Sequence, residues 1–386
     1  MENGDMLELQ HDALEFSFPE IHPEAKCTIE FQRTLRIPDD DKQYALPPGL
    51  GRFPAKHVDD YKRAPKKWVE HGGIMIPMYQ SEALWINFHP HYIHERGHAY
   101  PFAIKIATGK ISAITGKEWK KGLKKKDYVV LPEQPWLDGY VVENGEVRQF
   151  VAAPLGSGFS VEQQITGEDK HGGIQIEVFP MKAEIFNTKY PERPIDTRRR
   201  SVTRGIMPQS MGGFPGGSCG VVGVYSMTET LCSFNATREI DEKTSMNYCC
   251  DSMALNEDAD MSLAAGGRMK QQIFEDPHDF DVWAKKIKQR CFIHLCNSMV
   301  WRTLTGEAPP TTPLTANDYT SHGMPWFDYY NDDPALSGTE KLKGVKSVAA
   351  LQKEGKGKIL PENQSVNVPQ NQIKVISSKQ VTNGKW

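Results

Sequence analysis

Histidine side chains, which are frequent metal ligands, are concentrated in one short segment of the chain. The segment contains His89, His91, His94 and His98. Neutral imidazole is the commonest metal ligand in proteins, and alternating residues share one face of an extended strand. With the carboxylate of Glu95 nearby, a zinc or iron site is chemically feasible. The segment therefore predicts either a divalent-metal site or a polar surface loop.

The order His94-Glu95-x-x-His98 also matches a zinc-protease motif. In that motif the two histidines bind zinc from one face of a helix, and the glutamate acts as the general base. A helix is disfavoured here because Gly97 and Pro101 interrupt the segment. The sequence therefore favours a surface loop over a protease site.

Two tryptophan–aspartate pairs could bind a glycan or another small molecule. Trp136 lies two residues before Asp138, and Trp326 lies two residues before Asp328. Indole faces stack on the C–H surfaces of sugars, and carboxylates accept hydrogen bonds from hydroxyls. Two carboxyl groups about 5–10 Å apart would also suit a glycoside hydrolase. The alternative is that both indoles anchor loops against the sheet by burying their area and bonding their N–H groups.

A thiol and an imidazole form the third candidate for chemistry. On a helix, Cys291 and His294 would be neighbours three residues apart, and Cys296 follows closely. Because the surrounding residues are apolar, we expect these cysteines to lie in the core as small hydrophobic side chains. The adjacent Cys249 and Cys250 fit neither a zinc site nor a relaxed disulfide.

Lysines and glycines could bind phosphate groups in two segments. Six lysines surround Trp119 in the range 117–126. They could contact phosphate or an acidic partner, and a solvated loop is the simpler interpretation. The glycines at 212–217 are not followed by the Lys-Ser/Thr of a phosphate-binding loop, and no dinucleotide-binding fingerprint follows a strand. Nucleotide binding is therefore disfavoured.

The overall charge excludes some classes of partner. The chain has 386 residues, with 46 Lys+Arg against 49 Asp+Glu and a net charge of −3. Nucleic-acid-binding proteins are usually basic, so this class is disfavoured. No apolar run approaches the roughly 18 residues of a membrane span, and no secretion signal is present at the N-terminus. The seven scattered cysteines then favour reduced thiols and a cytoplasmic location.

Alternating apolar residues predict the strands that must position these groups. The pair Asn144-Gly145 between two apolar segments predicts a type I′ hairpin corner. A third strand is expected at 173–179, so that residues 137–179 would form a meander. Further short strands are expected at 25–37, 73–78, 83–88, 100–108 and 111–114. Short, regularly spaced strands of this kind predict an antiparallel β-sandwich.

Two helices are expected beside the strands. Ser160, with Gln163 three residues later, predicts a capping box at the start of a short helix. An apolar stripe predicts a long helix from about Asp279 to Leu304, with Gly306 just past its end. We expect this helix to pack on the sheet, which gives a β-rich α+β fold.

Changes in composition divide the chain into four parts. A β-sandwich domain is expected over 1–195, and a Gly-, Met- and Cys-rich insertion or partner-facing loop over 196–268, where only Cys219–Tyr225 is strand-like. Residues 269–335 would complete the core with the helix and an aromatic loop. Residues 336–386 are polar and would form an extended tail that wraps over the body or stays mobile.

Several short runs of residues resemble an uncharacterised family of soluble proteins. The runs are Leu46-Pro47-Pro48, Phe53-Pro54, Ile114-Thr115-Gly116, Pro135-Trp136-Leu137-Asp138-Gly139, Arg148-Gln149-Phe150-Val151-Ala152 and Glu162-Gln163-Gln164-Ile165-Thr166-Gly167. The resemblance extends from Ala45 to about Gly173 and from Gly266 to Tyr330. It implies that this central portion is one folding unit, and it implies no activity, cofactor or catalytic residue.

No motif in the chain specifies a reaction. The leading hypothesis is a non-catalytic binding or assembly protein of the cytosol, which binds a protein partner or self-associates through the insertion and the polar tail. The alternative is a carbohydrate-active or metal-assisted hydrolase, which would use the tryptophan–aspartate pairs and the histidines of residues 89–98 with a divalent metal as cofactor.

Overall fold

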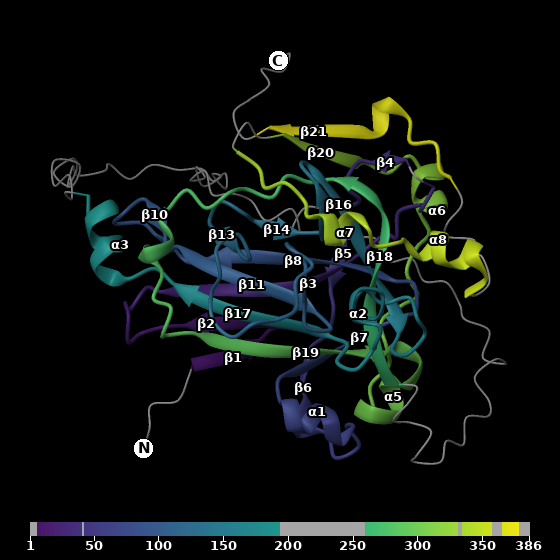
Figure 1. Ribbon diagram of the computed structural model, residues 1–386, viewed down its shortest axis with the longest axis horizontal. Coiled ribbons are helices and arrows are strands. Elements are labelled where there is room, and N and C mark those ends of the chain that lie inside the picture. Colours follow the sequence, from purple (N-terminus) through teal and green to yellow (C-terminus); the bar gives the residue numbers. More distant parts are fainter. Residues whose placement is uncertain (1–5, 41, 194–258, 331–333, 357–364, 378–386) are drawn as a thin grey trace, which may run out of the picture.

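The computed structural model describes residues 6–40, 42–193, 259–330, 334–356 and 365–377. Most strands among these residues join one large, mainly antiparallel sheet, and short helices lie around its margins (Figure 1). The protein is therefore β-rich and of the α+β class, as the strand pattern predicts.

A first antiparallel ladder carries the N-terminal strands. It consists, in spatial order, of β1 (Met6–Gln10), β2 (Ala13–Ser17), β3 (Lys26–Thr34), β8 (Ala83–Pro90) and β16 (Glu146–Pro154). Shorter strands extend it, namely β5 (Gly49–Arg52), β14 (Trp136–Leu137) and β15 (Gly139–Glu143). Strand β4 (Gln43–Tyr44) instead pairs in parallel with Arg268 and Met269. The strands expected at 25–37 and 83–88 are therefore confirmed.

A second ladder carries most of the remaining strands. Its order is β13 (Val129–Leu131), β11 (Phe102–Thr108), β17 (Ile174–Pro180), β19 (Gln289–Asn297), β7 (Ile74–Met78) and β6 (Lys56–His57), with β12 (Ile111–Ser112) beside β11. Only the pairing of β19 with β7 is parallel in this ladder. Strand β18 (Asp260–Lys270) pairs along β16 and also meets β19 at two residues, so it connects the two ladders.

The core lies between the two ladders. Phe31 and Ile86 of the first ladder belong to the same apolar cluster as Ile104 and Val178 of the second. Every residue of β11 and of β17 is buried, which means that both faces of these strands are covered. The arrangement is therefore sandwich-like, as expected from the short, punctuated strands.

The predicted meander is only partly correct. Strands β15 and β16 do form a hairpin across Asn144-Gly145. The corner is not type I′, because Gly145 has a φ of 74° whereas Asn144 is not among the residues with positive φ. The third strand, β17, pairs with β11 and β19 rather than with β16. The chain crosses from one ladder to the other between them.

The short predicted helix is confirmed. Helix α2 (Val161–Thr166) begins after Ser160, whose Oγ accepts a hydrogen bond from the backbone N–H of Gln163 at 2.9 Å. The box is not reciprocal, because the side chain of Gln163 donates to the backbone oxygen of Gly167 at 2.7 Å.

The long helix expected from Asp279 to Leu304 is wrong. Most of that range is strand β19, and only the 3₁₀ turn Phe280–Val282 and helix α5 (Ser298–Thr305) are helical. The physical reason lies in Cys291, Ile293 and Leu295, which alternate with a period of two and are all buried. Tertiary pairing of β19 with β17 and β7 therefore overrides the helical stripe.

The predicted insertion ends earlier than expected. Residues 194–258 lie outside the described residues, and with them the predictions for Cys219–Tyr225, for the glycines at 212–217 and for Cys249-Cys250. Strand β18, which begins at Asp260, occupies the end of the range expected as irregular.

The C-terminal tail wraps over the body in the part that the structure describes. Leu342 and Leu351 of the tail are buried. The elements at this end are α6 (Ala316–Ser321), β20 (Trp326–Tyr330), α7 (Glu340–Lys343), α8 (Val348–Leu351), a π-turn (Gln352–Lys356), a 3₁₀ turn (Gln370–Gln372) and β21 (Ile373–Ser377). Strands β20 and β21 form a separate parallel pair.

The remaining elements are short. They are the 3₁₀ turn Val58–Asp60, α1 (Lys66–His71), the strand pair β9 (Tyr92–Ile93) and β10 (His98–Ala99), and α3 (Ala183–Lys189). In the described part of the chain, no helix has the length and apolar character needed to cross a lipid bilayer.

Candidate functional site

The first tryptophan–aspartate pair is a directly bonded unit beside strand β8. Trp136 donates from Nε1 to Oδ2 of Asp138 at 2.6 Å. The backbone N–H of Asp138 donates to Oε1 of Gln271 at 2.9 Å. Burial raises the pKa of Asp138 to about 7, against the opposing effect of the Trp136 hydrogen bond. This carboxyl group is therefore held inside the protein.

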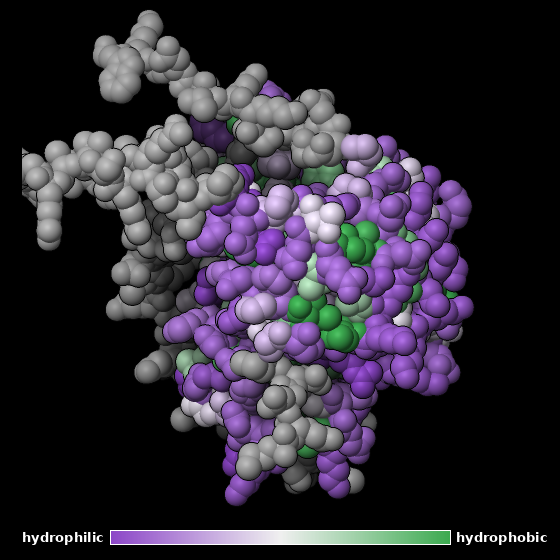
Figure 2. Space-filling model, turned by 90° about the vertical axis from the view of Figure 1, so that its left-hand side faces the viewer, coloured by the Kyte–Doolittle hydropathy of each residue, from purple (hydrophilic) through white to green (hydrophobic). Residues whose placement is uncertain are grey.

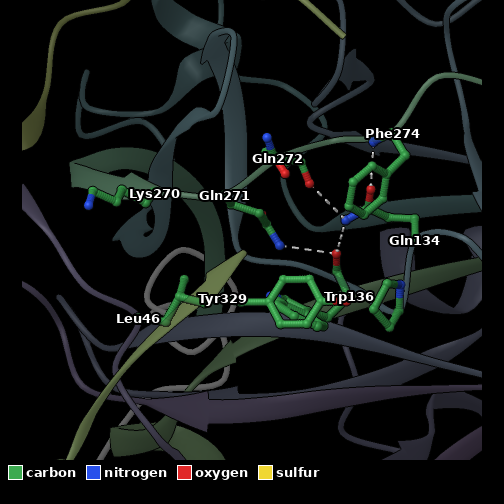
Figure 3. A pocket seen from close by; sticks show the side chains of 9 residues that line it. Leu46, Gln134, Trp136, Lys270, Gln271, Gln272, Phe274 and Tyr329 are labelled. Atoms are coloured by element: carbon green, nitrogen blue, oxygen red, sulfur yellow. Dashed lines mark hydrogen bonds between the residues drawn. The ribbon is translucent and has the colours of Figure 1, made fainter. Parts of the chain in front are cut away.

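Glutamine side chains fix the backbone of this unit. Gln134 and Gln271 both donate to the backbone oxygen of Trp136, at 2.8 and 3.1 Å (Figure 3). Gln134 also accepts from the backbone N–H of Phe274 at 3.0 Å. The cavity that these side chains line has a volume of about 10 Å³, which is room for a single water molecule.

The second pair lies on β20 and reaches the first through a neighbouring residue. Tyr329 packs edge-on against Trp136, with ring centroids 5.0 Å apart (Figure 3). Trp326 is fully buried and donates from Nε1 to Oγ1 of Thr320 at 3.3 Å. Oδ2 of Asp328 lies 3.5 Å from Nζ of Lys270. Both indoles therefore contact the protein's own side chains, as the anchoring alternative expects.

The four histidines of the predicted metal site do not share a ligand position. Nε2 of His89 lies 3.3 Å from Glu30, and Nε2 of His91 lies 3.0 Å from Glu24. His98 instead stacks on Tyr190 at 3.9 Å between centroids, and His94 meets Tyr92 edge-on at 5.3 Å. Among the described residues, no three His, Cys, Asp or Glu side chains are grouped so that they could hold a metal ion.

The residues of the zinc-protease motif do not form a helix. His94 and His98 belong to the turn and strand of the β9–β10 pair and not to a helix. The helix expectation was already disfavoured by Gly97, which adopts a φ of 65° at this turn. The segment therefore forms a hairpin turn and not the helix that the protease motif requires.

The thiol–imidazole candidate lies in the core, as expected, but on a strand. Cys291 and His294 are three residues apart on β19, so their side chains leave opposite faces of the strand. Burial raises the pKa of Cys291 to about 12 and lowers that of His294 to about 3. Burial also raises the pKa of Cys296. Neither thiol is therefore activated as a nucleophile.

A buried lysine beneath the lysine-rich loop is a feature that the sequence did not suggest. Nζ of Lys105 donates to the backbone oxygens of Lys120 and Gly122 at 2.7 and 2.9 Å. It also lies 4.1 Å from the ring centre of Trp119 and 3.8 Å from Glu177. The signal in the sequence was a single lysine within the otherwise apolar strand 102–108.

A second missed feature is a repeated hexapeptide. The order His-Gly-Gly-Ile-x-Ile begins at His71 and again at His171. Both copies lead into strands that pair with β19, and Ile74 and Ile174 both face Ile293 in the register. The repeat could have been found by comparing the chain with itself, although each copy alone reads as a turn before a strand.

Comparison of this chain with models of protein families, with curated proteins and with solved structures finds no match in any of the three. The resemblance of Pro135–Gly139 and Arg148–Ala152 to a family of soluble proteins stays a prediction. The case for a function therefore depends on the geometry of the chain itself.

Proposed function

We propose that this protein is a non-catalytic binding protein that captures an acidic segment of a partner protein through the lysine-rich loop, residues 117–126. The main support for the proposal is Lys105, a buried lysine of strand β11 that anchors this loop. Its two carbonyl contacts fix the loop backbone at Lys120 and Gly122. The six lysine side chains of the loop are all exposed.

Burying an ammonium group to anchor a loop lowers the stability of the folded protein unless the charge has close acceptors. An isolated buried charge costs several kcal/mol, and it persists only with close acceptors. Lys105 is only 1% exposed, and burial lowers its pKa, with Asp127 and Glu177 opposing that effect. Glu177 is in turn paired with Lys288 at 2.5 Å. An apolar residue would fill the same space, but it would not bind the loop carbonyls.

Other cationic groups continue the surface beyond the loop. Nζ of Lys285 lies 3.7 Å from the ring centre of Phe280, and Nζ of Lys125 lies 5.8 Å from it. Lys182, directly before α3, donates to the backbone oxygen of Asp281 at 2.7 Å. The face of the molecule at the α3 end is mostly hydrophilic, with small apolar areas (Figure 2). Acidic side chains with a few apolar residues fit such a surface.

Asp127, the acid that follows the loop, does not neutralise it at the surface. Its Oδ1 accepts from the hydroxyls of Ser112 and Thr115 at 2.5 and 2.9 Å, and its side chain is buried. The loop's own acid, Glu118, is exposed and Lys126 lies 3.5 Å from Glu275, so the loop keeps a reduced but net positive charge toward solvent. Because the whole chain carries a net charge of −3, this charge is local, which favours an acidic peptide over a long nucleic acid.

The test is binding of a fluorescein-labelled poly-glutamate peptide, followed by anisotropy at low salt. We expect the four changes Lys120→Glu, Lys121→Glu, Lys124→Glu and Lys125→Glu together to weaken binding about thirtyfold, because four exposed ion pairs contribute about 0.5 kcal/mol each. The matched control reverses Lys62, Lys66, Lys353 and Lys374, which are exposed elsewhere on the molecule. It makes the same change in net charge.

Three outcomes would overturn the proposal. These are no binding of the peptide to the unaltered protein, equal loss in both variants, or tighter binding of a single-stranded DNA of the same length. Loss in the loop variant alone, with the control unchanged, would support it.

The hydrolase alternative has weaker support. The ring of Trp136 is engaged by Tyr329, and the adjacent cavity of about 10 Å³ is too small for a sugar ring. No observation in the described residues favours it over binding of an acidic partner.

A further inference from the structure

The two His-Gly-Gly-Ile-x-Ile copies both lie close to Phe292 of strand β19. The ring of His71 stacks on that of Phe292 with centroids 4.8 Å apart and an interplanar angle of 2°. On the other copy, a Cβ at Gly173 would lie 2.7 Å from Cε1 of Phe292. Phe292 therefore contacts the chain beside both histidines.

The glycines of each copy are required by close backbone approach. A Cβ at Gly73 would collide with the backbone oxygen of Phe292, and one at Gly173 would lie 2.6 Å from the backbone oxygen of Ile293. Both glycines also have positive φ, 91° and 56°. The glycines of the repeat therefore allow each turn that carries a histidine to pack closely against the backbone of β19.

Two further lysines, Lys67 and Lys110, lie in segments that contact the turn at residues 170–173. Nζ of Lys67 in α1 donates to the backbone oxygen of Lys170, which ties α1 to the turn before His171. The backbone N–H of Gly109 donates to the backbone oxygens of Gly172 and Gly173 at 3.2 and 3.1 Å, which places the β11–β12 turn beside them. Lys110 is the other residue of that turn.

The backbone of Lys110 is strained. Gly109 and Lys110 are the two central residues of the β11–β12 hairpin, and both have positive φ, 53° and 60°. Glycine or asparagine is the usual residue in such a position, and a lysine there costs of order 1 kcal/mol. In the described part of the chain, no carboxylate lies within ion-pair distance of Lys110. The backbone N–H of Lys110 donates to Oε1 of Gln175 at 2.6 Å, which helps to hold the residue in this conformation.

We propose that Lys67, His71, Lys110 and His171 form a binding site for a phosphate-type oxyanion, either inorganic phosphate or a phosphomonoester. Two imidazoles and two ammonium groups, carried by α1, the β11–β12 turn and the turn before β17, supply the several donors that a tetrahedral dianion with several acceptor oxygens requires. A single carboxylate would leave most of these donors unused.

The charges around the histidines agree with an anion site. Burial, then Lys110 and Lys67, lower the pKa of His71, while Glu70 and Asp260 raise it. Burial, then Lys110, Lys67, His71 and Lys170, lower the pKa of His171. A carboxylate oxygen of Asp260 lies 3.7 Å from Nζ of Lys67, and one of Glu168 lies 2.5 Å from Nζ of Lys170. The ring of His294 stacks near that of His71, with centroids 6.0 Å apart. A bound dianion would raise the pKa of both histidines.

The experiment titrates inorganic phosphate, and separately phosphoserine, into the full protein and follows the imidazole NMR signals of His71 and His171. The variants His71→Gln and His171→Gln assign the signals. We expect both signals to move to saturation, and Lys110→Gly to weaken binding at least about tenfold, since a charge-assisted hydrogen bond is lost. The tighter of the two ligands identifies the source of the phosphate group.

Lys126→Gly is the matched control. Lys126 also has a φ of 60°, so both glycine variants should raise the melting temperature, but only Lys110→Gly should lose phosphate binding. The melting temperature also shows that each variant is folded. The proposal fails if the histidine signals stay still, if chloride at equal ionic strength moves them equally, or if the two glycine variants bind phosphate alike.

Discussion

The cluster around Trp136 and Asp138 and the cluster around His71 and His171 both combine aromatic rings with polar side chains, but the polar groups are satisfied to different degrees. In the first, the indole donates to the carboxyl group, two glutamines bond the backbone of the same segment, and Asp138 is 5% exposed. In the second, His71 remains accessible to solvent although one face of its ring stacks on Phe292, and no carboxylate among the described residues lies within ion-pair distance of Lys110. The aromatic–acid pair is therefore satisfied within the protein, whereas the positive charge of the second cluster is the basis of the phosphate site that we propose.

The largest effect should come from breaking the closed cluster. Trp136→Ala removes the contact with Tyr329 and leaves the carboxyl group of Asp138 without its N–H donor. We expect the free energy of unfolding in urea to fall by about 3 kcal/mol. Phosphate titration of the same variant should be unchanged. A normal stability, or a loss of phosphate binding, would contradict the separation of the two clusters.

Removing the charge of Lys105 should have the next largest effect. Lys105→Met leaves the backbone oxygens of Lys120 and Gly122 without their donor, at a cost of about 2 kcal/mol. Hydrogen exchange should accelerate within residues 117–126, and poly-glutamate should bind more weakly. Lys288→Met, which removes the other partner of Glu177, is the control that should leave the loop ordered. Unchanged exchange in Lys105→Met would show that the loop is held by other contacts.

The pH dependence of stability tests the closed carboxyl group. Because burial raises the pKa of Asp138 from 3.8 to about 7, the folded protein binds this proton more tightly than the unfolded chain does. Its contribution to stability is complete below about pH 3.8 and is lost as the pH rises toward about 7. Asp138→Asn should abolish this slope and stabilise the protein by about 1–2 kcal/mol at pH 8. Parallel pH profiles for both proteins would contradict this.

The smallest effect should be at the exposed histidines. The side chains of His91 and Glu24 are 50% and 46% exposed, so His91→Ala should change stability by less than about 0.5 kcal/mol. Melting curves with and without zinc, recorded for both proteins, complete the test. A zinc-dependent rise that His91→Ala removes would restore the metal hypothesis for this segment.

Local signals predicted local structure well in this chain. The cap at Ser160 and the corner at Asn144-Gly145 depend on neighbouring residues only, and both elements are present. The sequence failed at β19, where apolar residues on both faces fit a helical stripe as well as a buried strand. The pairing of the strands could not be predicted either, because β17 pairs with β11 and β19 and not with its sequence neighbour β16.

The candidate site residues likewise could be predicted where their contacts are local and not where the contacts are long-range. Trp136 and Asp138, which the sequence pairs as an indole and a carboxylate, do form a hydrogen bond with each other, while their role in binding a ligand stays a prediction. The proposed phosphate site at His71 and His171 was not predicted, because the strands that follow the two histidines are brought together by β19, more than a hundred residues further along the chain. Lys105 was missed because its partners are backbone oxygens of a loop, which no residue type reveals.

The position of β18 between the ladders has a consequence for synthesis of the chain. Strand β16 is complete at Pro154, but its neighbour β18 ends only at Lys270. At about 5–20 residues per second, a ribosome needs roughly 10 s to make the intervening stretch. During that time the nascent chain carries an open apolar strand edge, which makes it a natural client for chaperones that shield such edges until the missing strand emerges.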